Sequence, residues 1–327
     1  MAGRRAHRSV VGGRALAGGL ALAAGLTLAG CGGSEPAAVA DPSAAETRTV
    51  VHALGETEVE GVPERVVVLD TGELDTVLAL GVTPVGAVRT DVSSGLPGYL
   101  EEGGADPAEI AEVGTIGEPD LEAIAALDPD LILSNTARHT ELYDQLQAIA
   151  PTVMGEGVGE TWKQNLLVYA EALGRQDEGA ELLTEYRARA AEVGALFGDP
   201  AALEVSIVRF VGTGSARLYG EGSFIGTVLA DAGLAHPEVQ RTEETFVEVG
   251  PEEITQAEGD LLFYAAYGAE GESELAGLTS GGLWQSLPAV QRGDAVPVED
   301  DRWFLAIGPL GAGLVLDDLT EVAEQRA

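Results

Sequence analysis

The sequence has little cysteine and few basic residues, and both shortages exclude classes of protein. Cys31 is the only cysteine, so no disulfide can form within the chain and its core must be held together by burial alone. Lysine and arginine together number 18, against 54 aspartates and glutamates, which gives a net charge of −36. Binding to nucleic acid requires basic clusters that neutralise phosphates, and this composition excludes it.

The amino terminus has the pattern of an export signal. An uncharged stretch over residues 15–30 follows four arginines, which are Arg4, Arg5, Arg8 and Arg14. This stretch of 16 residues is shorter than the ~20 that a membrane-spanning helix needs and fits a secretory signal peptide. It ends in Leu28-Ala29-Gly30-Cys31, which resembles the lipobox of bacterial lipoproteins. Residues 1–30 are therefore predicted to be a signal peptide, and acyl chains on Cys31 to anchor the protein at the extracytoplasmic face of the cell membrane.

The rest of the chain is long enough for two lobes behind a tether. Residues 31–48 are rich in small residues and proline and lack periodicity, which is typical of a flexible tether. An amino-terminal lobe is predicted over residues 49–160, a bridging helix over 161–196 and a carboxyl-terminal lobe over 197–327.

Apolar runs and helical periodicities alternate in the first lobe. Residues 66–69 form a continuous apolar run, typical of a strand covered on both faces. The other predicted elements are a helix over 74–80 that Gly81 ends, a strand over 84–88, a helix over 121–127 and a strand over 131–133. Strand, helix and strand in this order predict parallel βαβ units, and therefore an α/β fold.

The second lobe repeats the first. Residues 121–133 align without gaps on residues 251–263, so that Asp130 matches Asp260 at an offset of 130. Between the two copies, residues 161–196 lack proline and are predicted to form one long helix, kinked near Gly174. Two similar lobes would face each other across a cleft, because ligands of such lobes bind beyond the carboxyl ends of parallel strands.

Several motifs resemble those of one known family. They are Pro63–Leu69, Gly72–Gly81, Gly117–Ile124 and Pro129–Ile132 in the first lobe, and Tyr219–Gly226, Leu229–Leu234 and Gly308–Ala312 in the second. They resemble the iron–siderophore substrate-binding lipoproteins of bacterial ABC importers. The resemblance implies two Rossmann-like α/β lobes with parallel sheets, joined by one long rigid helix. It also implies a monomer without cofactor or catalysis, whose ligand is a ferric siderophore and whose partners are the permease and ATPase subunits of an importer.

A ferric siderophore needs no metal ligands from the protein, because its iron is already coordinated. It needs aromatic surfaces and hydrogen-bond donors, which here stand mainly at predicted strand ends. The predicted ligand-binding residues are Arg89, Asn135, Trp162, Arg209, Tyr267 and Trp303. Weaker candidates are Arg302, Tyr219 and Phe224, whereas Trp284 is expected to be structural. The alternatives are surface ion pairs for Arg89 and Arg209 and a hydrophobic staple for Trp162.

The resemblance further implies that one glutamate on each lobe docks to the permease. Glu73 matches this position in the first lobe and is expected to be exposed at the start of a helix. In the second lobe the corresponding position holds Thr227, so Glu221 is a substitute candidate. The alternative is that Glu73 only complements its helix N-terminus.

The ligand class and several competing functions stay open. The acidic chain favours a neutral or cationic complex, such as a ferric hydroxamate, over a trianionic catecholate. Haem or cobalamin in the same fold is the alternative. A free metal-ion binder would need clustered histidines with carboxylates, whereas His52, His139 and His236 are widely spaced. An enzyme is disfavoured because no Gly-x-Ser-x-Gly motif or phosphate loop is present. The pairs Asp300-Asp301 and Asp317-Asp318 do not suit paired catalytic carboxylates, because the side chains of adjacent helical residues point in different directions.

The lipid anchor gives the first prediction. Changing Cys31→Ser removes the acceptor of the acyl chains, so metabolic labelling with a radioactive fatty acid should disappear. The variant should remain uncleaved or be released from the membrane. A wild-type protein that stays on the membrane without any lipid label would contradict the anchor.

Overall fold

A five-stranded parallel sheet forms the centre of the amino-terminal lobe. The computed structural model describes residues 47–91, 95–102 and 106–326, so the predicted signal peptide and Cys31 lie outside the described residues. The strand order is β5-β4-β3-β6-β7, with β3 (Val66–Val68), β4 (Gly86–Arg89), β5 (Ala111–Thr115), β6 (Leu131–Asn135) and β7 (Thr152–Gly155). A separate antiparallel hairpin comes before it, made of β1 (Thr47–His52) and β2 (Gly55–Glu60).

Helical segments connect these strands, as parallel pairing requires. They are α1 (Thr71–Ala79), α2 (Tyr99–Glu102), η1 (Pro107–Glu109), α3 (Leu121–Ala126), α4 (Thr136–His139), η2 (Thr140–Leu142) and α5 (Tyr143–Gln147). The apolar run predicted as a strand is confirmed, because all of β3 is buried. The stop predicted after the first helix is confirmed too, since Gly81 takes the left-handed φ of 73° that favours glycine.

The carboxyl-terminal lobe has a mixed sheet in the order β10-β9-β8-β11-β12. Its strands are β8 (Val205–Phe210), β9 (Ala216–Tyr219), β10 (Phe246–Val249), β11 (Leu261–Ala266) and β12 (Ala295–Pro297). The predicted parallel pairing holds for β8, β11 and β12, whereas β9 runs antiparallel to both neighbours. Only residues 211–215 separate β8 from β9, which is too short for a crossover and forces a hairpin.

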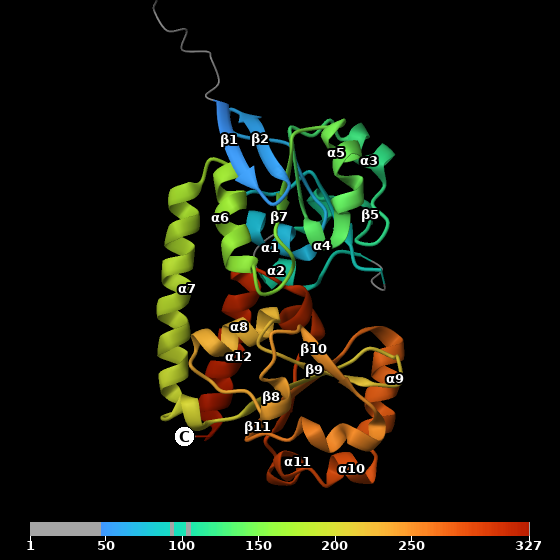
Figure 1. Ribbon diagram of the computed structural model, residues 1–327, viewed down its shortest axis with the longest axis vertical. Helices are drawn as coiled ribbons and strands as arrows, with labels where there is room; N and C mark the ends of the chain where they lie inside the picture. Colours follow the sequence, from blue (N-terminus) through green and yellow to red (C-terminus); the bar gives the residue numbers. More distant parts are fainter. Residues whose placement is uncertain (1–46, 92–94, 103–105, 327) are drawn as a thin grey trace, which may run out of the picture. The chain divides into compact units, whose positions relative to one another are not determined.

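Helices flank this second sheet as well (Figure 1). They are η3 (Pro200–Ala202), α8 (Phe224–Asp231), η4 (Glu238–Gln240), η5 (Pro251–Ala257), α9 (Gly268–Thr279), α10 (Gly282–Gln285), α11 (Pro288–Arg292), the π-helical turn η6 (Asp301–Leu305) and α12 (Pro309–Arg326). None of the helices in the described part of the chain is both long and apolar enough to cross a membrane.

The expectation of one continuous helix over residues 161–196 is wrong, but the helix is interrupted at Gly174, where a kink was predicted. The stretch forms α6 (Trp162–Ala172) and α7 (Gln176–Leu196), and Gly174 between them has a φ of 69°. The amides of Gly174 and Arg175 donate to the carbonyls of Glu171 and Ala170, which closes α6 as glycine-terminated helices commonly end. Helix α6 packs on the amino-terminal lobe, against α1, β1 and β7. Only α7 runs on to the second lobe, where it contacts α8 and α12 (Figure 1).

The sequence repeat corresponds to a repeated structural role. Asp130 stands before β6 and its two carboxylate oxygens accept from the amides of Glu64 and Arg65, at 2.8 and 2.9 Å. Asp260 stands before β11 and accepts from the amide of Glu204 at 2.9 Å. In each lobe this aspartate fixes the segment that leads into the neighbouring strand.

The two lobes share one apolar core. A single cluster of buried side chains includes Val66 from the first sheet, Ile207 from the second, and Leu316 from α12. At the junction, Asp75 of α1 is fully buried and accepts from the amides of Leu310 and Gly311, at 2.9 and 2.8 Å. The last helix, which follows β12 of the second lobe, is therefore held at its first turn by the first lobe.

Candidate functional site

A cavity of about 360 Å³ lies where residues of both lobes meet. Its lining residues are Ala137, Arg138, Val158, Gly159, Arg209, Arg217, Tyr219, Ser223, Phe224, Ile225, Thr245, Phe246, Trp303, Phe304 and Ile307. Aromatic rings and arginines thus dominate its wall. This size and character suit a small organic ligand with polar oxygens.

Arg209 is the most strongly fixed of the arginines on this wall. It stands one residue before the end of β8. Its Nε and Nη2 donate to the two carboxylate oxygens of Asp300 at 2.6 Å each, while Nη1 donates to the Tyr219 hydroxyl at 3.2 Å. The guanidinium carbon also lies 4.6 Å from the ring centre of Tyr267 and 4.8 Å from that of Phe304. Burial alone would lower the pKa of Arg209, but the bonds to Asp300 and Tyr219 raise it, so the group stays charged.

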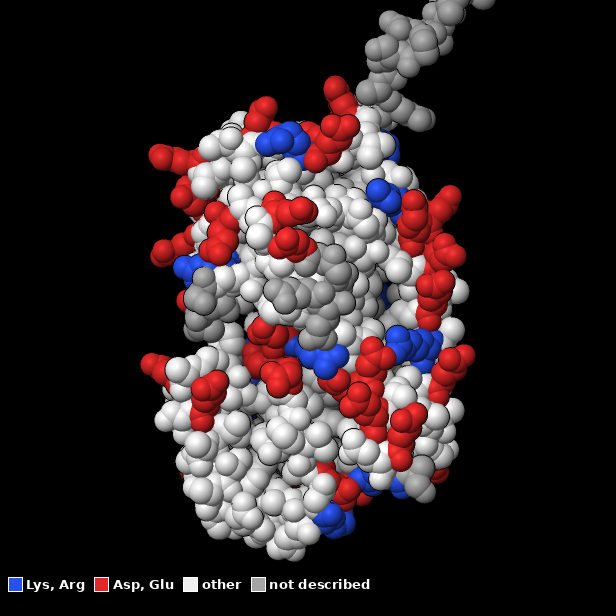
Figure 2. All heavy atoms as spheres, turned by 180° about the vertical axis from the view of Figure 1, so that it is seen from behind, with Lys and Arg blue, Asp and Glu red and all other residues white. Residues whose placement is uncertain are grey.

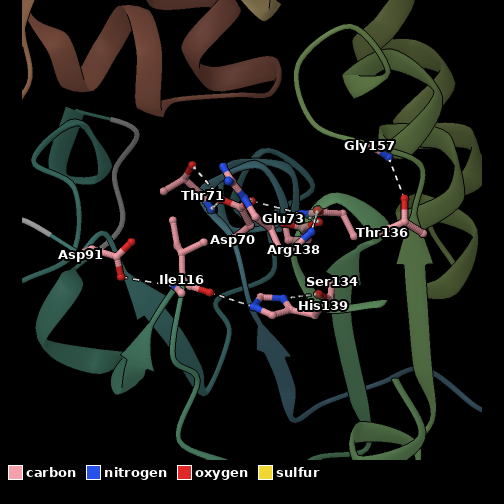
Figure 3. Close-up of polar contacts among 12 residues, drawn as sticks. Asp70, Thr71, Glu73, Asp91, Ile116, Ser134, Thr136, Arg138, His139 and Gly157 are labelled. Carbon is pink, nitrogen blue, oxygen red and sulfur yellow. Dashed lines mark hydrogen bonds and ion pairs between the residues drawn. The ribbon is translucent and has the colours of Figure 1, made fainter. Parts of the chain in front are cut away.

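Arg138 lines the same cavity from the first lobe. It sits in the short helix after β6, and its Nε donates to Asp70 at 2.9 Å (Figure 3). Asn135 positions it, because the Asn135 Oδ1 caps this helix by accepting from the Arg138 amide at 3.1 Å. Arg138 was not among the predicted ligand-binding residues, because those were chosen mainly at strand ends and Arg138 stands in the first turn of the following helix.

Arg217 was missed for a different reason. It lies on β9, a strand that the sequence analysis did not predict, and its Nε donates to Glu248 of β10 at 3.3 Å. Its guanidinium carbon stands 4.3 Å from the centre of the Phe246 ring, which also lines the cavity. A cross-strand pair on an antiparallel hairpin therefore supplies the third cation.

Several predicted ligand-binding residues do line this cavity. Trp303 is fully buried, donates from Nε1 to Asp318 at 2.7 Å and packs on Phe263 at 4.6 Å between ring centres. The weaker candidates Tyr219 and Phe224 also line it.

Other predicted residues lie elsewhere. Arg89 pairs with Glu112 at 3.6 Å on the first lobe. Tyr267 lines a neighbouring cavity of about 440 Å³, whose lining also includes Asp300, the partner of Arg209. Arg302 donates to Asp318 at 2.9 Å and does not line the 360 Å³ cavity.

Asn135 and Trp162 are buried and make contacts that hold elements of the fold together. Besides capping its helix, Asn135 donates from Nδ2 to Asp70 and Glu73, at 3.1 and 3.2 Å. Trp162 donates from Nε1 to Thr227 at 2.9 Å and packs edge-on against Phe224, which joins α6 to α8 of the other lobe. Trp284 lies in the core against Phe210, as expected of a structural residue.

The expectation that Glu73 is exposed is wrong. Only 2% of it is accessible, and it accepts from the Tyr169 hydroxyl at 2.6 Å and from Asn135. Burial raises the pKa of Glu73 to about 7, and the nearby charge of Asp70 is the second cause of this shift. Helix α1 packs against both α6 and α12, so its first turn faces protein rather than solvent. Glu221, by contrast, is exposed.

Two of the three histidines considered as metal ligands bond to other groups. His139 has Ser134 Oγ at 2.8 Å from Nδ1 and the Ile116 carbonyl at 2.8 Å from Nε2 (Figure 3). His52 bonds to Thr57 at 2.9 Å. Within the described ranges, no group of three or more histidine, cysteine, aspartate or glutamate side chains could hold a metal ion.

A family model described as periplasmic binding protein matches residues 66–299. The chain belongs to this family. Among its relatives, "Probable siderophore-binding lipoprotein YfiY" of Bacillus subtilis (strain 168) is 38% identical over 301 residues, which cover 88% of this chain and 91% of YfiY. The Fe(3+)-citrate-binding protein YfmC of the same organism is 31% identical over 282 residues, covering 84% and 85%.

A solved structure resembles this periplasmic binding protein in its whole fold. Staphylococcus aureus SirA, complexed with staphyloferrin B, superposes with a TM-score of 0.76 at 30% identity. The match covers 84% of this chain and 98% of SirA. The two-lobe α/β architecture implied by the sequence motifs is therefore confirmed.

Burial of Glu73 predicts a pH dependence of stability. Because its pKa is raised to about 7 in the folded protein, the fold retains a proton that the unfolded chain releases near pH 4.5. The free energy of unfolding should then fall as pH rises from about 4.5 to 7, by on the order of 3 kcal/mol from this group. Glu73→Gln, which carries no charge at any pH, should reduce the dependence measured by urea unfolding, and the part that remains is expected from Asp75, whose pKa burial also raises to about 7. Glu221→Gln is the exposed control and should keep the wild-type slope, whereas a wild-type slope in Glu73→Gln would contradict the assignment.

Proposed function

We propose that this periplasmic binding protein captures a ferric siderophore outside the cytoplasm and delivers it to an ABC importer. The observation that carries the proposal is the cavity at the lobe junction, where aromatic rings and guanidinium groups share one wall. The relatives support it: YfiY is named as a siderophore-binding lipoprotein, and SirA was solved with staphyloferrin B.

The wall suits a chelate rather than a bare ion. Tyr219, Phe246 and Phe304 present apolar ring surface to the organic shell, while the arginines can donate to chelating oxygens. The iron arrives already coordinated, so no protein ligand to it is needed. The role is binding and not catalysis.

Membrane attachment and transfer complete the proposal. Acyl chains on Cys31 hold the protein at the outer face of the membrane, and it works as a monomer beside the permease and ATPase subunits. Of the two glutamates considered for docking, only Glu221 has the exposure that contact with a permease needs.

A titration of the mature protein tests the ligand. Iron-loaded siderophores of several classes should quench tryptophan fluorescence, because Trp303 forms part of the cavity wall. Removing Arg209 alone would strand the buried Asp300 charge, so the test variant is Arg209→Gln with Asp300→Asn. It should bind the preferred siderophore roughly ten- to a hundredfold more weakly while melting near the wild-type temperature.

Arg189→Gln is the matched control, since Arg189 pairs with Asp317 on the outer surface, away from the cavity. It should bind like the wild type. Binding of haem or cobalamin in place of every ferric siderophore would refute the proposed ligand.

Docking gives a separate prediction. Glu221→Ala should leave binding in solution unchanged but reduce uptake of the radioactive iron chelate by cells, because exposed carboxylates guide association through charge. Glu192→Ala, an exposed change on α7, should not affect uptake. Wild-type uptake in the Glu221→Ala strain would exclude this residue from docking.

A further inference from the structure

The charge of the cavity wall is opposite to that of the chain. The protein has three times as many acidic as basic residues, and acidic side chains are prominent on the face shown in Figure 2. Yet the described residues that line the 360 Å³ cavity include three arginines and no aspartate or glutamate. The composition of the chain would lead one to expect the reverse.

The carboxylates that pair with these arginines are not part of the cavity lining. The Asp70 side chain is 1% exposed and that of Asp300 is 12% exposed, and neither lines the cavity. Glu248 pairs with Arg217 from the neighbouring strand and does not line it either. The carboxylates that pair with these arginines are thus absent from the lining of the 360 Å³ cavity, although Asp300 lines the neighbouring 440 Å³ cavity.

Each guanidinium keeps donors for a ligand. An arginine has five N–H groups. Among contacts of the described residues, Arg138 uses only its Nε, toward Asp70, so both terminal nitrogens stay available as a fork. Arg209 uses three N–H groups, toward Asp300 and Tyr219, and two are left. Arg217 uses only its Nε, toward Glu248.

Forked donors match carboxylates. Two parallel N–H groups bind the two oxygens of one carboxylate, and this pairing is stronger and more directional than bonds to neutral oxygens. In a ferric hydroxamate such as ferrichrome, the hydroxamate oxygens are bound to iron and the molecule has no free carboxylate. The wall thus discriminates by the charge and the geometry of groups on the outside of the chelate.

We propose that the ligand is an anionic ferric chelate with carboxylate groups at its surface, of the citrate type, gripped by Arg138 from one lobe and by Arg209 and Arg217 from the other. The inference rests on the proposed function and replaces the hydroxamate expectation, which came from net charge alone. Charges beyond the Debye length of about 8 Å are screened at physiological salt, so the contacting arginines outweigh the distant acidic surface.

Calorimetric titration with chelates of different charge tests this inference. The probes are ferric citrate, ferrichrome as a neutral hydroxamate, ferrioxamine B as a cationic one and ferric enterobactin as a catecholate. The wild-type protein should bind ferric citrate at least tenfold more tightly than the others. Arg138→Gln should weaken ferric citrate binding roughly ten- to a hundredfold, and Arg138→Lys should lie between, since it keeps the charge but loses the fork.

Controls separate this inference from the proposed function. Arg189→Gln should bind as the wild type does, and melting temperatures should show that the Arg138 variants are folded. If a hydroxamate or the catecholate binds most tightly, or if Arg138→Gln binds ferric citrate normally, the carboxylate assignment is overturned while siderophore capture stands. If no ferric chelate binds at all, both fall.

Discussion

The fully buried carboxylate of Asp75 sets the geometry of the lobe junction. Its two oxygens accept from the first amides of α12, at Leu310 and Gly311, where the helix dipole also favours a negative charge. The approach is so close that a Cβ on Gly308 would stand 2.3 Å from the carboxylate. The turn η6 and the segment to Ile307, which supply part of the cavity wall, lead directly into this fixed helix start. The wall therefore depends on a contact made by the opposite lobe.

Much of the fold can be predicted from local patterns. Continuous apolar runs mark strands covered on both faces. The repeat of residues 121–133 at 251–263 predicts the second lobe, and in both copies the aspartate accepts a hydrogen bond from the segment just before the neighbouring strand. Hydrophobic periodicity does not fix which way a polar residue faces. Glu73 is inside because α6 and α12 cover α1, and that packing involves residues far apart in the sequence. The same limit applies to Arg138, whose role depends on Asp70, a residue 68 positions away.

Net charge and local charge lead to different conclusions in this molecule. An excess of acidic residues describes the surface and the long-range field, which affects solubility and association. A ligand in the 360 Å³ cavity would meet a few side chains at contact distance, and these include three guanidinium groups whose carboxylate partners are not part of the lining. A buried pair such as Arg209–Asp300 costs desolvation energy and adds little stability by itself. It does hold one planar cation in a single orientation, further fixed by the rings of Tyr267 and Phe304.

The apolar core that runs through both lobes has a mechanical consequence. Separating the lobes would strip side chains such as Trp162 from their partners across the junction, including the hydroxyl of Thr227 that accepts from its ring N–H. Exposed apolar area costs about 25 cal/mol per Å², so wide opening is expensive without outside help. An importer that opens the two lobes widely to release a ligand would therefore have to supply the energy of this separation.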